Sequence, residues 1–408
     1  MRFARRPLDA RLFSSHAGLL FGGAAVVGMF FWLAYPGLAF YFTDDDIMNI
    51  RRAWSIPVSR LIIDSLTFNP QAYRPIGLLW YRGMFGLFGL TPGPFHWFCF
   101  ALIVANLYLL YSLVKVLSGS PGAGVLAALL GCFHAQMDAL YFTSAQAYDI
   151  LCCTAYFLCL YLYVSRRQSG RPVGLSGAAY ITVLFFLGLN SKEMAAALPI
   201  VLICYELIYF TGSLRERTRH LALPFALAVT AGIFAYRKTT GDALLTRGYS
   251  PQYTFERALS NVQEYLGQLL YLGHPLTRSI TLLVLLGLFI TLLAVRNKAA
   301  RFLLLFVLVS PLPILFVEAR GLAALYIPVM ASAATLAFMT TLLTTKVFGE
   351  TSSLRTVSTF IVLGALLGVA HYRERRHHFD LTWGKGPLGC KNTLHAAIPS
   401  CQIPRRYS

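Results

Sequence analysis

The stretch AGLLFGGAAVVGMFFWLAYPGLA at residues 17–39, with Phe42-Thr43-Asp44-Asp45-Asp46 just after it, decides the fold. About 20 apolar residues cross the hydrocarbon core of a bilayer as a helix, and this run is long enough. Three adjacent carboxylates then stand where the helix leaves the membrane. Charge is costly to hold at such a position, because it loses hydration. Two interpretations stay open: a solvated helix end, or a catalytic and metal-binding acidic cluster of a membrane enzyme.

The composition is that of a membrane protein throughout its length. Of 408 residues, 57% are hydrophobic and 13% are charged, whereas a soluble domain has about 25% charged residues. We therefore predict an all-α polytopic membrane protein surrounded by lipid. The net charge of +18 indicates no nucleic-acid partner, because Lys and Arg gather in the cytoplasmic loops of membrane proteins.

Apolar segments predict about eleven transmembrane helices, the first starting in the cytoplasm after Arg2, Arg5, Arg6 and Arg11. No cleavage site of a removable signal peptide is evident. The segments are 17–39, 94–117, 122–142, 148–165, 174–189, 194–210, 220–236, 276–295, 302–317, 321–344 and 356–371.

Two long outer loops separate these spans, at residues 40–93 and 237–275. Each holds a segment that suits a helix lying in the membrane interface, at 76–90 and 253–271. We expect one transmembrane domain over 1–371.

The polar tail at 372–408 holds Cys390 and Cys401, which could pair in an outer compartment. Arg373, Arg375 and Arg376 directly follow the last span, against the usual charge bias. The cysteines weigh slightly more, and we place the tail outside.

The predicted topology sorts the acidic residues. All but Asp9, Glu206, Glu216 and Glu350 of the 17 acids fall at or near the outer side. Solubility alone gives no reason for such sorting, whereas an active site at the outer face does.

Several short motifs follow the acidic stretch in a fixed order. They are Tyr73-Arg74-Pro75, Phe88-Gly89-Leu90-Thr91-Pro92, His96, Asn106, Phe133-His134-Ala135-Gln136-Met137-Asp138, Ser191-Lys192-Glu193 with Pro199, Glu318-Ala319-Arg320 and Leu325-Tyr326-Ile327-Pro328. In this order the chain resembles the GT-C glycosyltransferases over about residues 17–345. It is most similar to the protein O-mannosyltransferase-like branch, which includes the transmembrane, TPR-containing mannosyltransferases and their bacterial relatives.

The sequence departs from that family at three points. Ala135 stands where the family often has Pro, residues 321–324 interrupt a late Arg-Tyr-Leu-Tyr-type run, and no TPR repeats follow. These departures concern the acceptor and the exact branch more than the fold.

The resemblance implies a GT-C-like bundle and an inverting transfer of a sugar. The donor would be a polyprenyl-phosphate carrier, and the acceptor an unidentified hydroxyl at the outer face of a bacterial cytoplasmic (inner) membrane. An acceptor hydroxyl needs a general base. Asp45 is the expected base, since it belongs to the acidic pair in either alignment register, with Asp44 or Asp46 as its partner. A divalent cation held by Asp45 and Asp46 is the alternative that would neutralise the cluster.

The departing phosphate needs fixed positive charge in the transition state. Arg320 and Lys192 are the expected donor-phosphate ligands, each beside an acid in the sequence, Glu318 and Glu193 respectively. Arg74 either anchors the first outer loop or touches the carrier phosphate.

Asp138 and Asp149 lie near the outer ends of apolar spans, and intramembrane carboxylates are functional candidates. His134 beside Asp138 marks a second polar site or a buried structural histidine. A transporter or flippase of lipid-linked or small polar substrates is the competing function, although paired broken helices in two similar halves are not evident. An inactive GT-C-like assembly protein is the third interpretation, against which the intact Asp cluster argues.

Overall fold

The chain folds into a bundle of helices with shorter helices across one end. The computed structural model describes residues 16–70, 72, 74–210, 212–239, 250–348 and 353–382, and within these residues it has no strand. Five helical segments are long and apolar enough to cross a membrane: Gly18–Ala39, Pro92–Ser118, Ala147–Gln168, Arg215–Thr239 and Leu322–Lys346. The prediction of an all-α polytopic membrane protein is confirmed.

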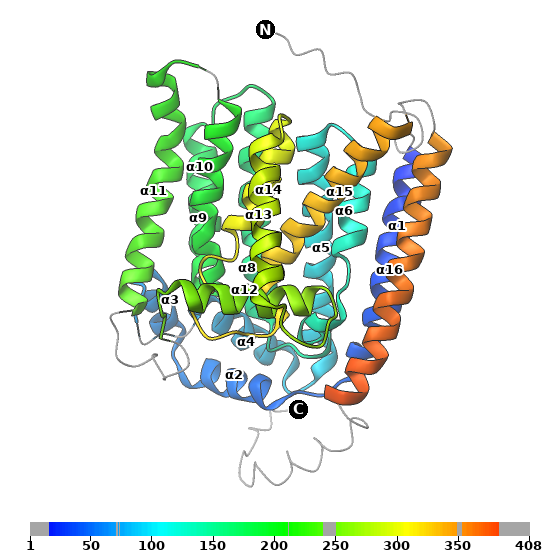
Figure 1. The fold of residues 1–408 in the computed structure, drawn as a ribbon. Helices are drawn as coiled ribbons and strands as arrows, with labels where there is room; N and C mark the ends of the chain where they lie inside the picture. Colours follow the sequence, from blue (N-terminus) through cyan, green and yellow to red (C-terminus); the bar gives the residue numbers. More distant parts are fainter. Residues whose placement is uncertain are drawn as a thin grey trace.

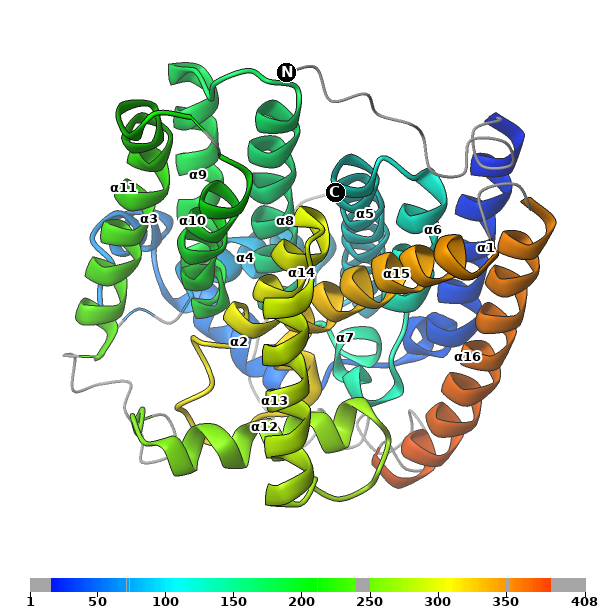
Figure 2. The same ribbon diagram turned by 45° about the horizontal axis from the view of Figure 1, so that its top comes forward.

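The long helices run side by side between two ends of the molecule (Figure 1). They are α1 (His16–Ala34), α5 (Pro92–Ser118), α6 (Pro121–Gly131), α8 (Ala147–Gln168), α9 (Leu175–Ser191), α10 (Leu198–Tyr209), α11 (Leu214–Thr239), α13 (Arg278–Ala294), α14 (Lys298–Val309), α15 (Tyr326–Phe348) and α16 (Ser353–Thr382). Each corresponds to one predicted span. Helix α15 runs obliquely from α14 towards α1, as Figure 2 shows.

Both predicted interfacial segments are helical and lie at the same end of the bundle (Figure 1). The first outer loop forms α2 (Asp44–Ser55), α3 (Val58–Leu66) and α4 (Pro75–Phe88), and the second forms α12 (Phe255–Leu269). Helix α16 ends at this end too, and it continues through residue 371 to Thr382. Residues 383–408, with Cys390 and Cys401, lie outside the described residues.

The third predicted span is not one helix, which corrects the prediction for 122–142. Helix α6 ends at Gly131, and the chain continues as the 3-10 turn η2 (Ala135–Met137) and the short α7 (Ala139–Phe142). Two backbone amides freed by this break find hydroxyl acceptors: His134 N donates to the Tyr141 hydroxyl and Ala135 N to the Tyr271 hydroxyl. Apolar composition alone therefore overestimated the helix.

Other predicted spans differ from the structure at their ends. Helix α14 ends at Val309 rather than 317, because Pro311 and Pro313 follow and proline lacks the N–H a helix needs. Short 3-10 turns precede α10 and α15: η3 (Glu193–Ala197) and η4 (Leu322–Leu325). Another, η1 (Tyr35–Ala39), ends the first span.

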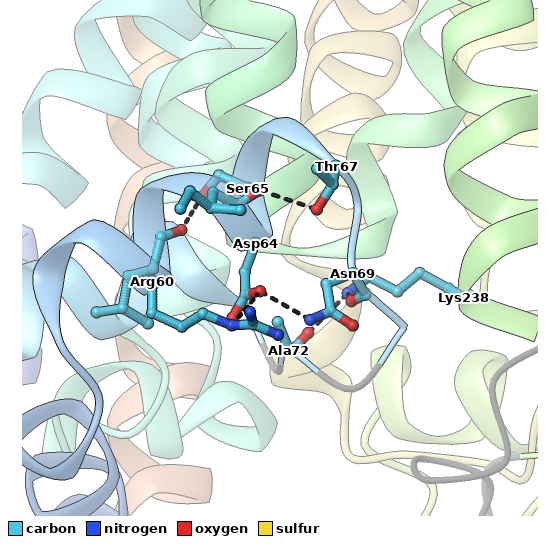
Figure 3. A network of polar contacts seen from close by, with 9 residues as sticks. Arg60, Asp64, Ser65, Thr67, Asn69, Ala72 and Lys238 are labelled. Carbon is cyan, nitrogen blue, oxygen red and sulfur yellow. Dashed lines mark hydrogen bonds and ion pairs between the residues drawn. The ribbon is translucent and has the colours of Figure 1, made fainter.

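A small apolar core, separate from the main core of the bundle, packs the first outer loop against the bundle. It is made by Phe42, Ile50, Ala53, Leu61, Leu78, Tyr81, Met84, Phe95 and Tyr148. A polar network ties the far side of the loop to α11 (Figure 3). Asp64 accepts from Asn69 Nδ2 at 2.7 Å, and Lys238 Nζ donates to the carbonyls of Asn69 and Ala72, each at 2.6 Å. The loop is thus fixed at both edges.

Gly77 on α4 gives a direct test of this seating. A Cβ there would lie 1.9 Å from Cδ1 of Tyr148, so we expect Gly77→Ala to destabilise the protein by about 1–3 kcal/mol through overpacking. Gly83→Ala on the same helix is the matched control, since a Cβ at Gly83 meets nothing within 4 Å. Thermal unfolding of the detergent-solubilised variants measures both, and equal melting temperatures would contradict the packing.

Candidate active site

The first turn of α2 is fixed by the buried carboxylate of Asp46. Asp46 and Thr43 form a capping box, in which the Thr43 amide and hydroxyl donate to Oδ2 at 2.9 and 2.8 Å. The Thr143 hydroxyl donates to the same oxygen at 2.7 Å, and the Ser144 hydroxyl donates to Oδ1 at 2.6 Å. These bonds attach α2 to the turn between α7 and α8, about 100 residues further along the chain.

Tyr81 of α4 also belongs to this cluster. Its hydroxyl donates to the Ser144 carbonyl at 2.6 Å and lies 3.4 Å from Asp46 Oδ1. Burial, followed by the nearby charge of Asp46, raises the pKa of Tyr81 well above its ordinary value. The hydroxyl therefore stays protonated and donates at any physiological pH.

Asp44 and Asp45 are exposed, in contrast to Asp46. They occupy the first turn of α2, where the partial positive charge of the helix N-terminus favours a carboxylate. Asp45 lies one turn before Asn49, on the same helix face. Asn49 is 4% exposed, and its Oδ1 is buried without a hydrogen-bond partner among the described residues. The three predicted acids thus divide into one structural and two accessible carboxylates.

The opposite end of α2 is held by Arg82. Its Nη1 donates to the carbonyls of Ala53, Trp54 and Ile56 at 3.0, 3.1 and 2.7 Å, which places a cation at the helix C-terminus. Both ends of α2 are therefore fixed on α4.

Tyr148, at the start of α8, connects the Asp46 cluster to a second polar cluster. Its ring lies 5.7 Å from that of Tyr81, and the Arg74 guanidinium carbon lies 5.3 Å from its centroid. Arg74 precedes α4 with φ 45° and ψ 62°, in the left-handed region. Tyr73, next to it, lies outside the described residues.

Two ion pairs make up this second cluster. Lys192 Nζ pairs with Asp149 Oδ1, and both side chains are buried. Arg74 Nη2 contacts Oε1 and Oε2 of Glu193 at 3.2 and 3.3 Å. Lys192 therefore pairs across to α8 and not with its sequence neighbour, and Glu193 neutralises Arg74 instead.

Glu193 is held in its charged form. Burial acts to raise the pKa of its carboxyl, but the charges of Arg74 and Lys192 outweigh burial and hold the pKa below its usual range. Glu193 is thus ionised at neutral pH.

His134 is buried. Its Nε2 lies 3.1 Å from the Leu269 carbonyl, and its ring stacks on Tyr271 with centroids 4.3 Å apart. Burial and the neighbouring His371 lower the pKa of His134 to about 3. The ring is uncharged at neutral pH and offers no charge to a phosphate. Asp138 caps α7 by accepting from Ala139 N at 2.7 Å.

Arg320 lies in the segment that follows α14, against α12. Its amide donates to the Tyr265 hydroxyl at 3.3 Å. Asn261 of α12 holds the same segment by donating to the carbonyls of Leu315 and Val317 at 2.7 and 2.6 Å. Among the described residues, no hydrogen bond or ion pair joins Arg320 to Lys192 or Arg74.

The donor set does not fit a divalent ion at Asp46. Both of its oxygens already accept from hydroxyl or amide donors, and a metal ligand needs those lone pairs. Across the described ranges, no three His, Cys, Asp or Glu side chains gather to hold a metal.

Sequence reasoning missed the residues that bind these groups together. Thr143, Ser144, Tyr81 and Tyr148 look like loop and packing residues in the sequence. The one local signal was Thr43 three residues before Asp46, the spacing of a capping box, which marks the acid as structural.

Comparison with known proteins finds one family. Residues 73–236 match the family model of dolichyl-phosphate-mannose-protein mannosyltransferases. That range contains Arg74, Tyr148, Asp149, Lys192 and Glu193, and it ends within α11. No curated protein and no solved structure matches the chain.

The buried Lys192–Asp149 pair makes a sharp stability prediction. Lys192→Met leaves Asp149 buried without its cation, which destabilises a protein by about 3–5 kcal/mol. We expect Lys192→Met with Asp149→Leu to recover most of that loss. Arg278→Gln, which breaks the exposed Arg278–Glu256 pair, serves as control and changes stability by about 1 kcal/mol at most. Chemical or thermal unfolding in detergent compares the four proteins, and additive losses in the double variant would contradict the pairing.

Proposed function

We propose, from the premise that this chain is a GT-C mannosyltransferase-like membrane protein, that it moves a sugar from a polyprenyl-phosphate carrier to an acceptor hydroxyl. The reaction inverts the anomeric carbon. The acceptor oxygen forms the new bond to C1, its proton goes to a carboxylate, and the C1–O bond to phosphate breaks. The carrier phosphate leaves with the electron pair.

Asp45 is the proposed base. Asp46 is committed to four donors, which leaves Asp44 and Asp45 accessible on the same turn. Asp45 shares a helix face with the buried amide of Asn49 and so borders the seam between α2 and the bundle. Asp44 is its neighbour on the solvent side. The fixed ends of α2 keep this carboxylate in place, which is the condition for efficient proton transfer.

Arg74 is the proposed first ligand of the donor phosphate. It lies on Tyr148, next to the Asp46 cluster, and its partner Glu193 is partly exposed. An arginine binds phosphate through parallel hydrogen bonds. Lys192 adds positive charge nearby, balanced by Asp149. Arg320 is proposed as a more distant cation, in the segment that follows α14 and lies against α12.

The distribution of basic residues supports an active site facing away from the cytoplasm. The helix ends opposite to α2 carry Lys115, Arg166, Arg167, Arg215, Arg217, Arg219, Lys298 and Arg301, and the described acids at this end are Glu206 and Glu216. Basic residues therefore exceed acidic residues at this end, and cytoplasmic segments are rich in Lys and Arg. We propose the cytoplasmic membrane of a bacterium as the location.

One observation carries the proposal most strongly. The hydrogen bonds from Thr143 and Ser144 to Asp46 hold the acidic turn of α2 against the start of α8, where Tyr148 and Asp149 meet Arg74 and Lys192. A base and a phosphate-binding cation therefore belong to one fixed cluster at one end of the bundle.

Asp45→Asn tests the base. We expect transfer of mannose from dolichyl phosphate mannose to membrane acceptors, and its hydrolytic release, to fall by about 10²- to 10⁴-fold. The melting temperature should stay that of the unaltered protein, because Asp45 is exposed. Radiolabelled donor added to membranes that contain the protein measures both reactions.

Glu256→Gln, at another exposed acid of the outer loops, is the matched control and should keep full activity. Undiminished transfer by Asp45→Asn, together with a loss in Asp44→Asn, would move the base to Asp44. Full activity in both variants would remove the acidic turn from the mechanism.

A further inference from the structure

The two ion pairs beside Tyr148 differ in a way that suggests different roles. Lys192 and Asp149 are 6% and 2% exposed, whereas the Glu193 side chain is 42% exposed. Water reaches Glu193, so this carboxylate can leave its partner without passing through an apolar interior. The Lys192–Asp149 pair has no such route, since separating it would leave two buried charges.

The contact between Arg74 and Glu193 also has loose geometry. One nitrogen, Nη2, faces both carboxylate oxygens at 3.2 and 3.3 Å. Strong charge-assisted bonds measure about 2.7–2.9 Å, and arginine binds most firmly through two parallel bonds. The contact between Arg74 and Glu193 therefore has the geometry of a weak ion pair, which a phosphate oxygen can displace.

Arg74 itself is held by more than Glu193. Its guanidinium lies on the face of Tyr148, and its backbone adopts φ 45°, a conformation that costs a non-glycine residue about 1–3 kcal/mol and clusters at binding sites. Tyr148 is buried and packed against Gly77. The cation thus keeps its place when the carboxylate moves.

We propose that Glu193 is the resident anion of an exchangeable phosphate site on Arg74, displaced by the carrier phosphate of the donor and returning when the product leaves. This inference rests on the proposed function and deepens it. A carboxylate and a phosphate oxygen compete for the same N–H groups, so Glu193 lowers the affinity of the site for every polyprenyl phosphate.

The exchange of Glu193 and phosphate on Arg74 helps the enzyme turn over, because the product carries more negative charge than the donor. The sugar-linked carrier is a phosphodiester with one negative charge, and the released polyprenyl phosphate is a monoester with about 1.5 to 2. An arginine without a competitor would bind the product more tightly than the donor. A carboxylate poised to return to Arg74 accelerates product release.

The chain offers a purely structural comparison for this contact. Glu206 at the other end of the bundle is 1% exposed and binds Arg167 Nε and Nη2 through separate oxygens at 2.6 and 2.9 Å. That pair has the parallel geometry and burial of a permanent tie. The Arg74–Glu193 pair has neither.

Binding of farnesyl phosphate tests the proposal without knowledge of the acceptor. We expect Glu193→Gln to bind farnesyl phosphate about three- to fivefold more tightly than the unaltered protein, the gain from removing a partly exposed ion pair. Glu193→Asp, whose shorter side chain withdraws the charge from Arg74, should shift in the same direction. Thermal-shift titration of the solubilised protein measures the affinity, with farnesol as the uncharged control. Arg74→Gln should lose the response, and Glu256→Gln should match the unaltered protein.

Turnover of dolichyl phosphate mannose separates this inference from the proposed function. For Glu193→Gln we expect a lower KM for the donor and stronger inhibition by farnesyl phosphate, with slower steady-state turnover after an unchanged first turnover. An unchanged or weaker affinity for farnesyl phosphate would overturn the exchange, even if the enzyme is active. Tighter binding in a protein that turns over no donor would support the anion site and contradict the proposed function.

Discussion

The end of the bundle that carries α2 depends on one buried carboxylate and the donors that surround it. Asp46 is fully buried, and charge buried without compensation costs several kcal/mol. Here Thr43, Thr143 and Ser144 supply that compensation through short hydrogen bonds. Because two of these donors come from the turn before α8, satisfying the charge also fixes α2 on the bundle. Arg82 and Lys238 then hold the other parts of the first outer loop.

The helices could be predicted from the sequence, because each is encoded by its own apolar run. A run of about 20 apolar residues has few alternatives in a membrane, where backbone groups must bond within the segment. The errors fell where side chains or prolines override composition, as at Pro311 and at the break after Gly131. Local composition does not reveal that the hydroxyls of Tyr141 and Tyr271 accept hydrogen bonds from two of the freed amides there.

The sequence singles out acids and cations of the candidate site but does not reveal their partners. Asp44, Asp45 and Asp46 look alike in the sequence, yet successive residues of a helix point about 100° apart, so only one of them faces the bundle. Which one does so is decided by Thr143 and Ser144, which are nearly 100 residues away. Similarly, the partner of Lys192 is Asp149 on another helix, although the sequence places Glu193 beside it.

The break in the third span explains how two distant loops come to share one end of the bundle. The segment from His134 to Ser144 binds α12 on one side, through the Leu269 carbonyl and the Tyr271 hydroxyl, and α2 on the other, through Asp46. A continuous helix across 122–142 would have used the Ala135 amide internally and left no backbone donor for Tyr271. The interruption that apolar composition failed to predict therefore lets this segment bind the second outer loop, while the hydroxyls at its end bind the acidic turn of the first.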